Sequence, residues 1–196
     1  MLQSQYSWHS TAQVLNICDE YCNEFDIRLN AEKSNLLYFG KQIHVSFELK
    51  LNSKALKWKE SCKYLGITLL SGKSFNCSVT DRIKKFYWCA NSILRIEGRS
   101  SDTVMLRVIE THCIPLLTYA IEIVYVQNRD ERRQLRVAYN SVFRRIFGYR
   151  WSELVTALQH FLNRPTWEEL VEKRHSKFVQ RLTSHNDQSL ARAYIR

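Results

Sequence analysis

Apolar residues recur at helical spacing in the first part of the chain. Ser10 and Gln13 form a capping-box pattern, which predicts that a helix starts there. The apolar residues that follow at helical spacing are Val14, Leu15, Cys18, Tyr21, Cys22 and Phe25. They lie on one face, so we expect an amphipathic helix packed on a core.

From residue 26 the pattern becomes that of short strands. Strands are predicted over residues 26–30 and 36–39, the second closed by a glycine. Apolar and polar residues then alternate strictly over residues 43–51, as in a strand with one buried face. A turn at residues 52–54 and a second alternating stretch at residues 56–59 complete a predicted hairpin.

Gly66 interrupts the last predicted strand, which covers residues 64–70. A glycine within a strand usually marks a bulge or a place where something must approach the backbone closely. The neighbouring Leu65 is expected to be a core residue.

Near residues 71–73 the pattern changes from that of short strands to that of helices, and capped helices are predicted after this point. Their capping pairs are Ser78 with Asp81, Asn128 with Glu131, and Thr166 with Glu169, and a further helix is expected to start near Ser101-Asp102 and to run to Cys113. Pro115 is expected to end a helix, to kink it, or to begin a new one in its first turn. Gly148 is expected to stop the helix before it. The fold class expected is α+β, with an N-terminal helix and a small antiparallel sheet followed by a helical region.

The charge balance narrows the choice of partner. The chain has 29 Lys and Arg against 19 Asp and Glu, a formal net charge of +10. Such an excess favours a polyanionic partner, of which nucleic acid is the usual one. A basic globular protein without such a partner is the alternative.

Neither a membrane span nor a metal site is indicated. No apolar run approaches the ~18 residues of a membrane helix, and no signal peptide is recognisable at the start. We therefore expect an intracellular protein, nuclear or cytoplasmic. The six cysteines and six histidines are scattered without metal-ligand spacing, so core cysteines are expected rather than a zinc site or disulfides.

Four short motifs occur in the order and spacing found in the reverse transcriptases of non-LTR (LINE-type) retrotransposons. The motifs are residues 25–30 (FDIRLN) with Lys33-Ser34, residues 62–67 (CKYLGI), residues 115–119 (PLLTY) and residues 140–148 (NSVFRRIFG). Over residues 11–182 the chain thus resembles the part of such an enzyme that follows its catalytic strand. The sequence departs from the family pattern at Ala120, where the family often has glycine, and at Ile123 and Val124, where a tryptophan is expected.

The resemblance implies three regions. Residues 1–71 would be a partial palm with the primer-grip hairpin, residues 72–127 the thumb helices, and residues 128–196 a basic post-thumb helical region. The family's catalytic Tyr/Phe-x-Asp-Asp strand would lie upstream of Met1, and the chain contains no Asp-Asp pair. Aspartates of that kind hold the two Mg²⁺ ions of the parent enzyme. This chain alone is therefore expected to be inactive and to carry no cofactor.

The resemblance also implies roles for individual residues. Lys33 would stand near the phosphates of the incoming nucleotide as an accessory cation, or else be a surface lysine beside a turn. Lys63, Tyr64 and Gly66 would hold the primer end, since glycine lets a sugar-phosphate backbone come close and lysine offers a charge to a phosphate. The alternative for this segment is an ordinary buried strand.

Basic residues of two predicted helices are further candidates for contact with a primer–template duplex of RNA and DNA. Such contacts to phosphates would not read bases. These candidates are Arg82, Lys84 and Lys85 in the first helix, and Arg132, Arg133, Arg136, Arg144 and Arg145 in the second. Solvated helix faces, with some pairing to acidic side chains, are the alternative.

Two classes of function remain open. The chain is a fragment of a retrotransposon RNA-directed DNA polymerase that contributes primer–template binding, with the missing N-terminal polymerase portion as a partner. Alternatively, it is a non-catalytic nucleic-acid-binding or interaction protein co-opted from a transposon remnant. An in-frame Tyr/Phe-x-Asp-Asp strand encoded upstream of Met1 would favour the first, and a host gene without such a frame the second.

Overall fold

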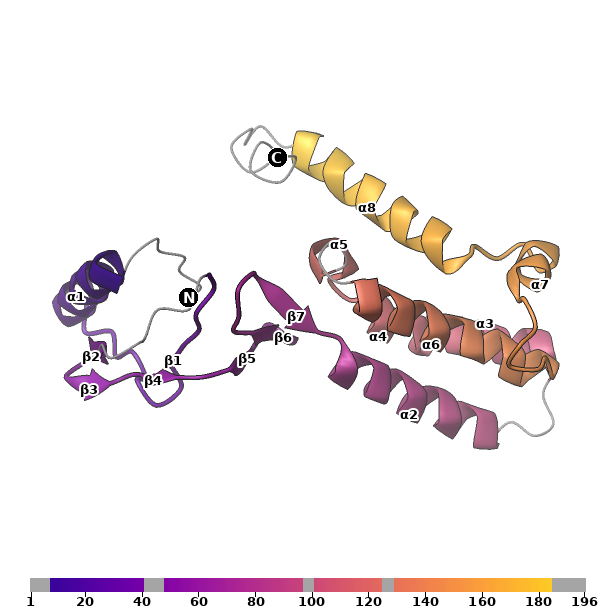
Figure 1. Ribbon diagram of the computed structural model, residues 1–196, viewed down its shortest axis with the longest axis horizontal. Helices are drawn as coiled ribbons and strands as arrows, with labels where there is room; N and C mark the ends of the chain where they lie inside the picture. Colours follow the sequence, from indigo (N-terminus) through magenta and orange to yellow (C-terminus); the bar gives the residue numbers. More distant parts are fainter. Residues whose placement is uncertain (1–7, 41–47, 97–100, 125–128, 185–196) are drawn as a thin grey trace. The chain divides into compact units, whose positions relative to one another are not determined.

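The computed structural model divides into two compact units, residues 1–77 and residues 78–196. It describes residues 8–40, 48–96, 101–124 and 129–184 (Figure 1). The first unit holds one helix and short strands, and the second is helical. The α+β class and its order along the chain are those expected from the sequence.

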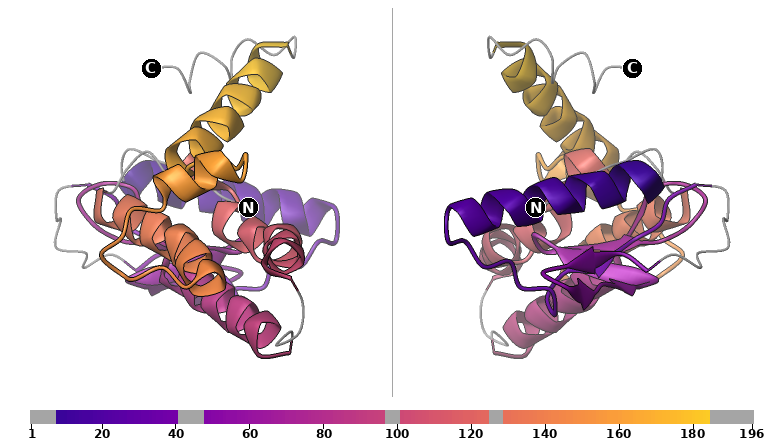
Figure 2. Two further views of the ribbon diagram at one scale, coloured as in Figure 1. Left: turned by 90° about the vertical axis from the view of Figure 1, so that its right-hand side faces the viewer. Right: turned by 90° about the vertical axis from the view of Figure 1, so that its left-hand side faces the viewer.

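Helix α1, Trp8–Glu24, is the single helix described in the first unit. Ser10 lies within it, so the capping box predicted there does not mark its start. Cys22 is buried, and α1 contacts strand β2 along one side of the unit (Figure 2). Part of the predicted apolar face, including Tyr21 and Phe25, is nevertheless exposed.

Short strand pairs follow α1. Strands β2 (Lys50–Leu51) and β3 (Lys54–Ala55) form an antiparallel hairpin around the predicted turn. Strands β1 (Asn35–Leu36) and β4 (Lys57–Trp58) pair in parallel, which the sequence pattern did not indicate. The strand predicted over residues 26–30 is wrong, because that segment has no strand pairing in the structure. Residues 41–47 of the predicted alternating strand lie outside the described part of the chain.

A three-stranded sheet ends the first unit, with the strand order β5, β6, β7. Its strands are β5 (Ser61–Tyr64), β6 (Ile67–Leu70) and β7 (Asn76–Ser78). The single strand that the residue pattern predicted over residues 64–70, interrupted by Gly66, is wrong, because the chain reverses after Tyr64 and β5 pairs antiparallel with β6, as in the hairpin that the resemblance implied. Such a two-residue turn needs positive φ, which glycine adopts without strain, and Gly66 supplies it at the second position.

The second unit is a group of packed helices. Its helices are α2 (Thr80–Ile96), α3 (Asp102–His112), α4 (Ile114–Thr118), α5 (Ile121–Val124), α6 (Arg129–Phe147), α7 (Thr156–Phe161) and α8 (Trp167–Ser184). Helices α2, α3, α4 and α6 pack against one another, and α8 contacts α5 and α6 (Figure 1). The largest fully buried side chains of this core are Trp167, Phe86, Phe143, Ile109, Leu117, Ile121 and Leu135.

Several predicted helix ends are confirmed. Glu169 accepts a hydrogen bond from the Thr166 backbone nitrogen at 2.8 Å, and its own nitrogen donates to the Thr166 hydroxyl at 3.3 Å, which completes the capping box of α8. Gly148 stops α6, and Pro115 lies in the first turn of α4. The cap predicted at Asn128 lies outside the described residues.

Within the described residues, no helix is long and apolar enough to cross a membrane.

Candidate nucleic-acid interface

The hairpin between β5 and β6 presents Leu65 and Gly66 at its tip. Both residues have positive φ, 46° and 80°, as a two-residue type I′ turn requires. Leu65 is 72% exposed, so the expectation that it belongs to the core is wrong. The preceding Lys63 is exposed and Tyr64 half-buried. The end of the hairpin therefore has an exposed cation at Lys63 and an exposed glycine backbone at Gly66.

Lys33 is an exposed residue of a turn organised by Asn30. The Asn30 side-chain oxygen accepts hydrogen bonds from the backbone nitrogens of Glu32, at 3.0 Å, and Lys33, at 3.2 Å. The Ser34 hydroxyl donates to the Asn30 carbonyl at 2.9 Å. An asparagine that caps its own turn in this way stabilises the local backbone through hydrogen bonds within residues 30–34.

The first turns of α2 carry the first group of candidate cations. Lys84 and Lys85 are exposed, and Trp88, one helical turn after Lys84, is 75% exposed. Arg82 has a structural contact, because its guanidinium donates to the Leu117 carbonyl at 3.5 Å. The two lysines and Trp88 thus form the accessible part of this group.

Glu131 lies beside Arg82 and connects the starts of α2 and α6. Burial raises the pKa of the Glu131 carboxyl above its ordinary value, while a hydrogen bond from the Val79 backbone and the charge of Arg82 oppose this rise. Arg82 consequently has a carboxylate neighbour, which reduces the charge that it can offer to a phosphate.

The arginines of α6 differ in their surroundings. Arg136 forms an ion pair with Glu168 at 3.4 Å, and Arg145 donates to the side-chain oxygen of Asn91. Arg144 donates to the Glu153 carbonyl at 3.0 Å. These three positions therefore join α6 to neighbouring elements as well as carrying charge.

The two remaining candidates of α6 differ in exposure. Arg133 is exposed, whereas Arg132 is half-buried. The structure thus brings the helical candidates onto α2 and α6 of one unit, while Lys33, Lys63, Tyr64 and Gly66 belong to the other.

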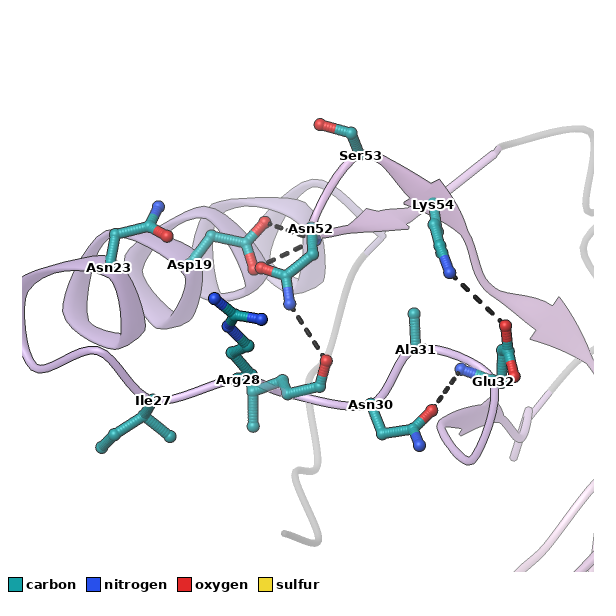
Figure 3. Close-up of a pocket in the computed structure, with 11 residues that line it drawn as sticks. Asp19, Asn23, Ile27, Arg28, Asn30, Ala31, Glu32, Asn52, Ser53 and Lys54 are labelled. Atoms are coloured by element: carbon teal, nitrogen blue, oxygen red, sulfur yellow. Dashed lines mark hydrogen bonds and ion pairs between the residues drawn. The ribbon is translucent and has the colours of Figure 1, made fainter.

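A pocket of about 740 Å³ opens in the first unit between the end of α1, the segment after it and the β2–β3 turn (Figure 3). The Asp19 carboxylate accepts hydrogen bonds from the Asn52 backbone nitrogen at 3.0 and 3.2 Å. The Asn52 side chain donates to the Leu29 carbonyl at 3.0 Å, and Lys54 forms an ion pair with Glu32 at 3.4 Å. Both carboxylates are thus engaged within the protein.

Sequence reasoning missed this pocket, because Asp19 and Asn52 are far apart in the chain and no motif connects them. A signal existed only at Asn52-Ser53, where turn-forming residues take the positive φ values of 50° and 61°. Among the described residues, no three His, Cys, Asp or Glu side chains lie together as metal ligands would.

Comparison with known proteins finds relatives among polymerases of mobile elements. The chain is 21% identical to the RNA-directed DNA polymerase from mobile element jockey of Drosophila melanogaster and 24% identical to that of Drosophila funebris. Each match covers 92% of this chain and 20% of the polymerase. The probable RNA-directed DNA polymerase from transposon BS of Drosophila melanogaster is 24% identical over 85% of this chain and 19% of its own length.

No family model and no solved structure matches the chain. The similarity nevertheless runs through nearly the whole chain in each of these polymerases. The chain spans about a fifth of their length. It is therefore a distant homologue of the RNA-directed DNA polymerases of non-LTR retrotransposons.

Proposed function

We propose that this chain is part of the RNA-directed DNA polymerase of a non-LTR retrotransposon and that it holds the primer–template duplex. The homology over about nine-tenths of the chain is the observation that carries this proposal. In this proposal, residues 1–71 form the end of the palm with the primer grip, residues 72–127 form the thumb, and residues 128–196 form a basic post-thumb region.

The hairpin tip has the chemistry that a primer grip needs. Lys63 offers a positive charge to a backbone phosphate, and Gly66 has no side chain that would keep the sugar-phosphate backbone away. Because Leu65 is exposed beside them, it can cover the apolar face of a terminal sugar or base. The hairpin thus provides one short, specific contact at the primer end.

The exposed lysines of α2 have the chemistry for a second contact. Lys84 and Lys85 present two adjacent flexible ammonium groups, which attract phosphates without reading bases. The net charge of +10 gives the whole chain a field of the right sign for a duplex. Together these features support binding that depends strongly on salt and weakly on sequence.

The chain alone is proposed to bind and not to polymerise. The Asp-Asp strand that holds Mg²⁺ in the parent enzyme has no counterpart in the sequence, and the described residues bring no three ligand-type side chains together. We therefore propose that the metal pair is held outside these residues, and we assign no catalytic step to them. Lys33 remains a proposed accessory cation that acts only in the whole polymerase.

Titration of a labelled RNA–DNA hybrid at several salt concentrations tests the proposal. Removing the two charges by Lys84→Gln with Lys85→Gln should weaken binding and reduce the slope of log affinity against log salt by about 2, since each phosphate contact contributes about 1. The matched control is Lys173→Gln with Lys177→Gln, which removes the same charge from two exposed positions of α8.

The comparison of the two double variants decides the outcome. If both lower the affinity and the salt slope equally, only net charge matters and the assigned surface is wrong. If the unmodified chain binds the hybrid with no dependence on salt, phosphate contact itself is refuted. Lys63→Gln should weaken binding to a hybrid with a recessed primer end more than binding to a blunt one.

A further inference from the structure

A structured loop follows α6 and carries exposed aromatic side chains. Helix α6 ends at Phe147, the next residue, Gly148, has a φ of 70°, and the Tyr149 nitrogen donates to the Arg144 carbonyl at 2.9 Å. This is the hydrogen bond of a Schellman motif, in which a left-handed glycine turns the chain sharply away from the helix axis. The chain then runs back beside the last turn of α6.

Glu153 holds this loop in place. The Arg144 guanidinium donates to the Glu153 carbonyl at 3.0 Å, and the Glu153 nitrogen donates to the Arg150 carbonyl at 3.1 Å. The Glu153 carboxylate accepts a hydrogen bond from the Arg150 backbone nitrogen. Both ends of the loop are therefore tied to Arg144 of α6, and the hydrogen bonds between Arg150 and Glu153 close the loop on itself.

Trp151 occupies the exposed crest of this loop. Its side chain is 77% exposed, although a tryptophan is among the most costly residues to leave in water. The Arg144 guanidinium lies 6.0 Å from the centre of its ring, which is cation–π range. Tyr149 and Arg150, which are also exposed, flank it in sequence. An indole with the Arg144 guanidinium near its ring is thus presented to solvent by this loop.

We propose that this loop, residues 149–153 with Arg144, is a stacking site for a base of single-stranded nucleic acid. A base stacks on an exposed aromatic ring whatever its identity, because every base has a π-face. The neighbouring guanidiniums supply the charge for the adjacent phosphates. This site goes beyond duplex binding by the primer grip and α2, and it stands whether or not that proposal holds.

The charges around Trp151 favour a nucleic acid over a protein partner. Arg144 and Arg150 place two positive charges in and beside the loop, against the single negative charge of Glu153. A polyanion would gain from this imbalance. Leu154 and Phe161 are also exposed, and an apolar protein partner would be expected to contact them.

Fluorescence anisotropy of a labelled oligouridine with the full chain tests the proposal. Trp151→Ala should weaken binding about tenfold, which is within the range found for loss of one stacked base. Trp151→Phe should recover most of that affinity, because it restores an aromatic face. Since the side chain is largely exposed, neither variant should alter the circular dichroism spectrum or the melting temperature.

Matched controls separate this site from other effects. Leu154→Ala with Phe161→Ala should leave the affinity for oligouridine unchanged, and Trp151→Ala should leave the affinity for the blunt RNA–DNA hybrid unchanged. If Trp151→Ala binds oligouridine as well as the unmodified chain, or if Trp151→Phe is as defective as the alanine variant, the stacking site is refuted. A loss in the Leu154 and Phe161 double variant as large as that of Trp151→Ala would also overturn it, in favour of an apolar docking surface.

Discussion

The hydroxyl of Tyr139 donates a hydrogen bond to the backbone carbonyl of Pro165 at 2.8 Å. Tyr139 lies in the middle of α6, and Pro165 lies just before α8. The phenol ring also contacts Phe143 and Trp167, with ring centres 5.3 and 5.5 Å away. One buried side chain therefore joins the most basic helix to the start of the last one.

Replacing Tyr139 by phenylalanine should destabilise the second unit by about 1 kcal/mol, because the Pro165 carbonyl loses its donor while the ring packing remains. Urea unfolding followed by circular dichroism measures the change. Tyr149→Phe, at an exposed position after α6, is the matched control and should have almost no effect. An equal loss of stability in both variants would mean that the hydrogen bond to the Pro165 carbonyl makes no contribution of its own to the free energy of unfolding.

The same tyrosine should make stability depend on pH in the alkaline range. Burial raises the pKa of Tyr139 above its ordinary value of 10.0, with the charge of Glu110 acting in the same direction. In the unfolded chain the phenol ionises first, so the free energy of unfolding should fall as the pH rises above 10.0. Tyr139→Phe should show a smaller fall over this range.

The ion pair between Glu110 and Arg164 should contribute measurably to stability. Its atoms are 2.6 Å apart, and each side chain is only 26% exposed, so solvent screens the pair less than a fully exposed one. We expect Glu110→Gln to lower the free energy of unfolding by about 1 kcal/mol. In a double-mutant cycle, the effects of Glu110→Gln and Arg164→Gln should not be additive. The more exposed pair of Arg136 and Glu168 is the control, and a coupling as large there would contradict the argument from burial.

Helix ends could be predicted from the sequence better than strands. The Thr166–Glu169 capping box and the stop at Gly148 depend on residues close together in the chain, so their signals are local. The parallel pairing of β1 with β4 joins residues 35 and 57, and no local pattern encodes such a pairing. The hairpin turn at Leu65 was expected from the family resemblance and not from the residue pattern, because leucine rarely adopts positive φ and the glycine beside it could equally mark a bulge.

The sequence predicted which helices carry the cations of the candidate interface, but not which of these cations are free to bind a phosphate. Counting cations identified α2 and α6, but charge in the sequence does not say which guanidinium is already bound. Arg145 with Asn91 and Arg136 with Glu168 are contacts between residues distant in the chain. Trp151 was missed for the opposite reason, because an isolated tryptophan in sequence is usually a core residue.

Replacing Ala120 by glycine and Gly148 by alanine should change the free energy of unfolding in opposite directions. Both have positive φ, 49° and 70°, where a Cβ atom is unfavourable. Ala120→Gly should raise the free energy of unfolding by up to about 1 kcal/mol, and Gly148→Ala should lower it by about 1 kcal/mol. No atom outside its chain neighbours lies within 4 Å of a Cβ built at Gly148, so backbone strain alone is tested there. Changes of the same sign in both variants would refute this reading.

The apolar face of α1 should cause the isolated chain to self-associate. Ile17, Tyr21 and Phe25 lie one helical turn apart, are each more than half exposed, and bring the Tyr21 and Phe25 rings within 4.6 Å of each other. Such a contiguous exposed stripe favours association. Ile17→Gln with Phe25→Gln should lower the apparent mass in sedimentation velocity, whereas Val104→Gln on α3, a single exposed apolar residue, should not. If the unmodified chain sediments as a monomer at all concentrations tested, the prediction that this face causes self-association is wrong.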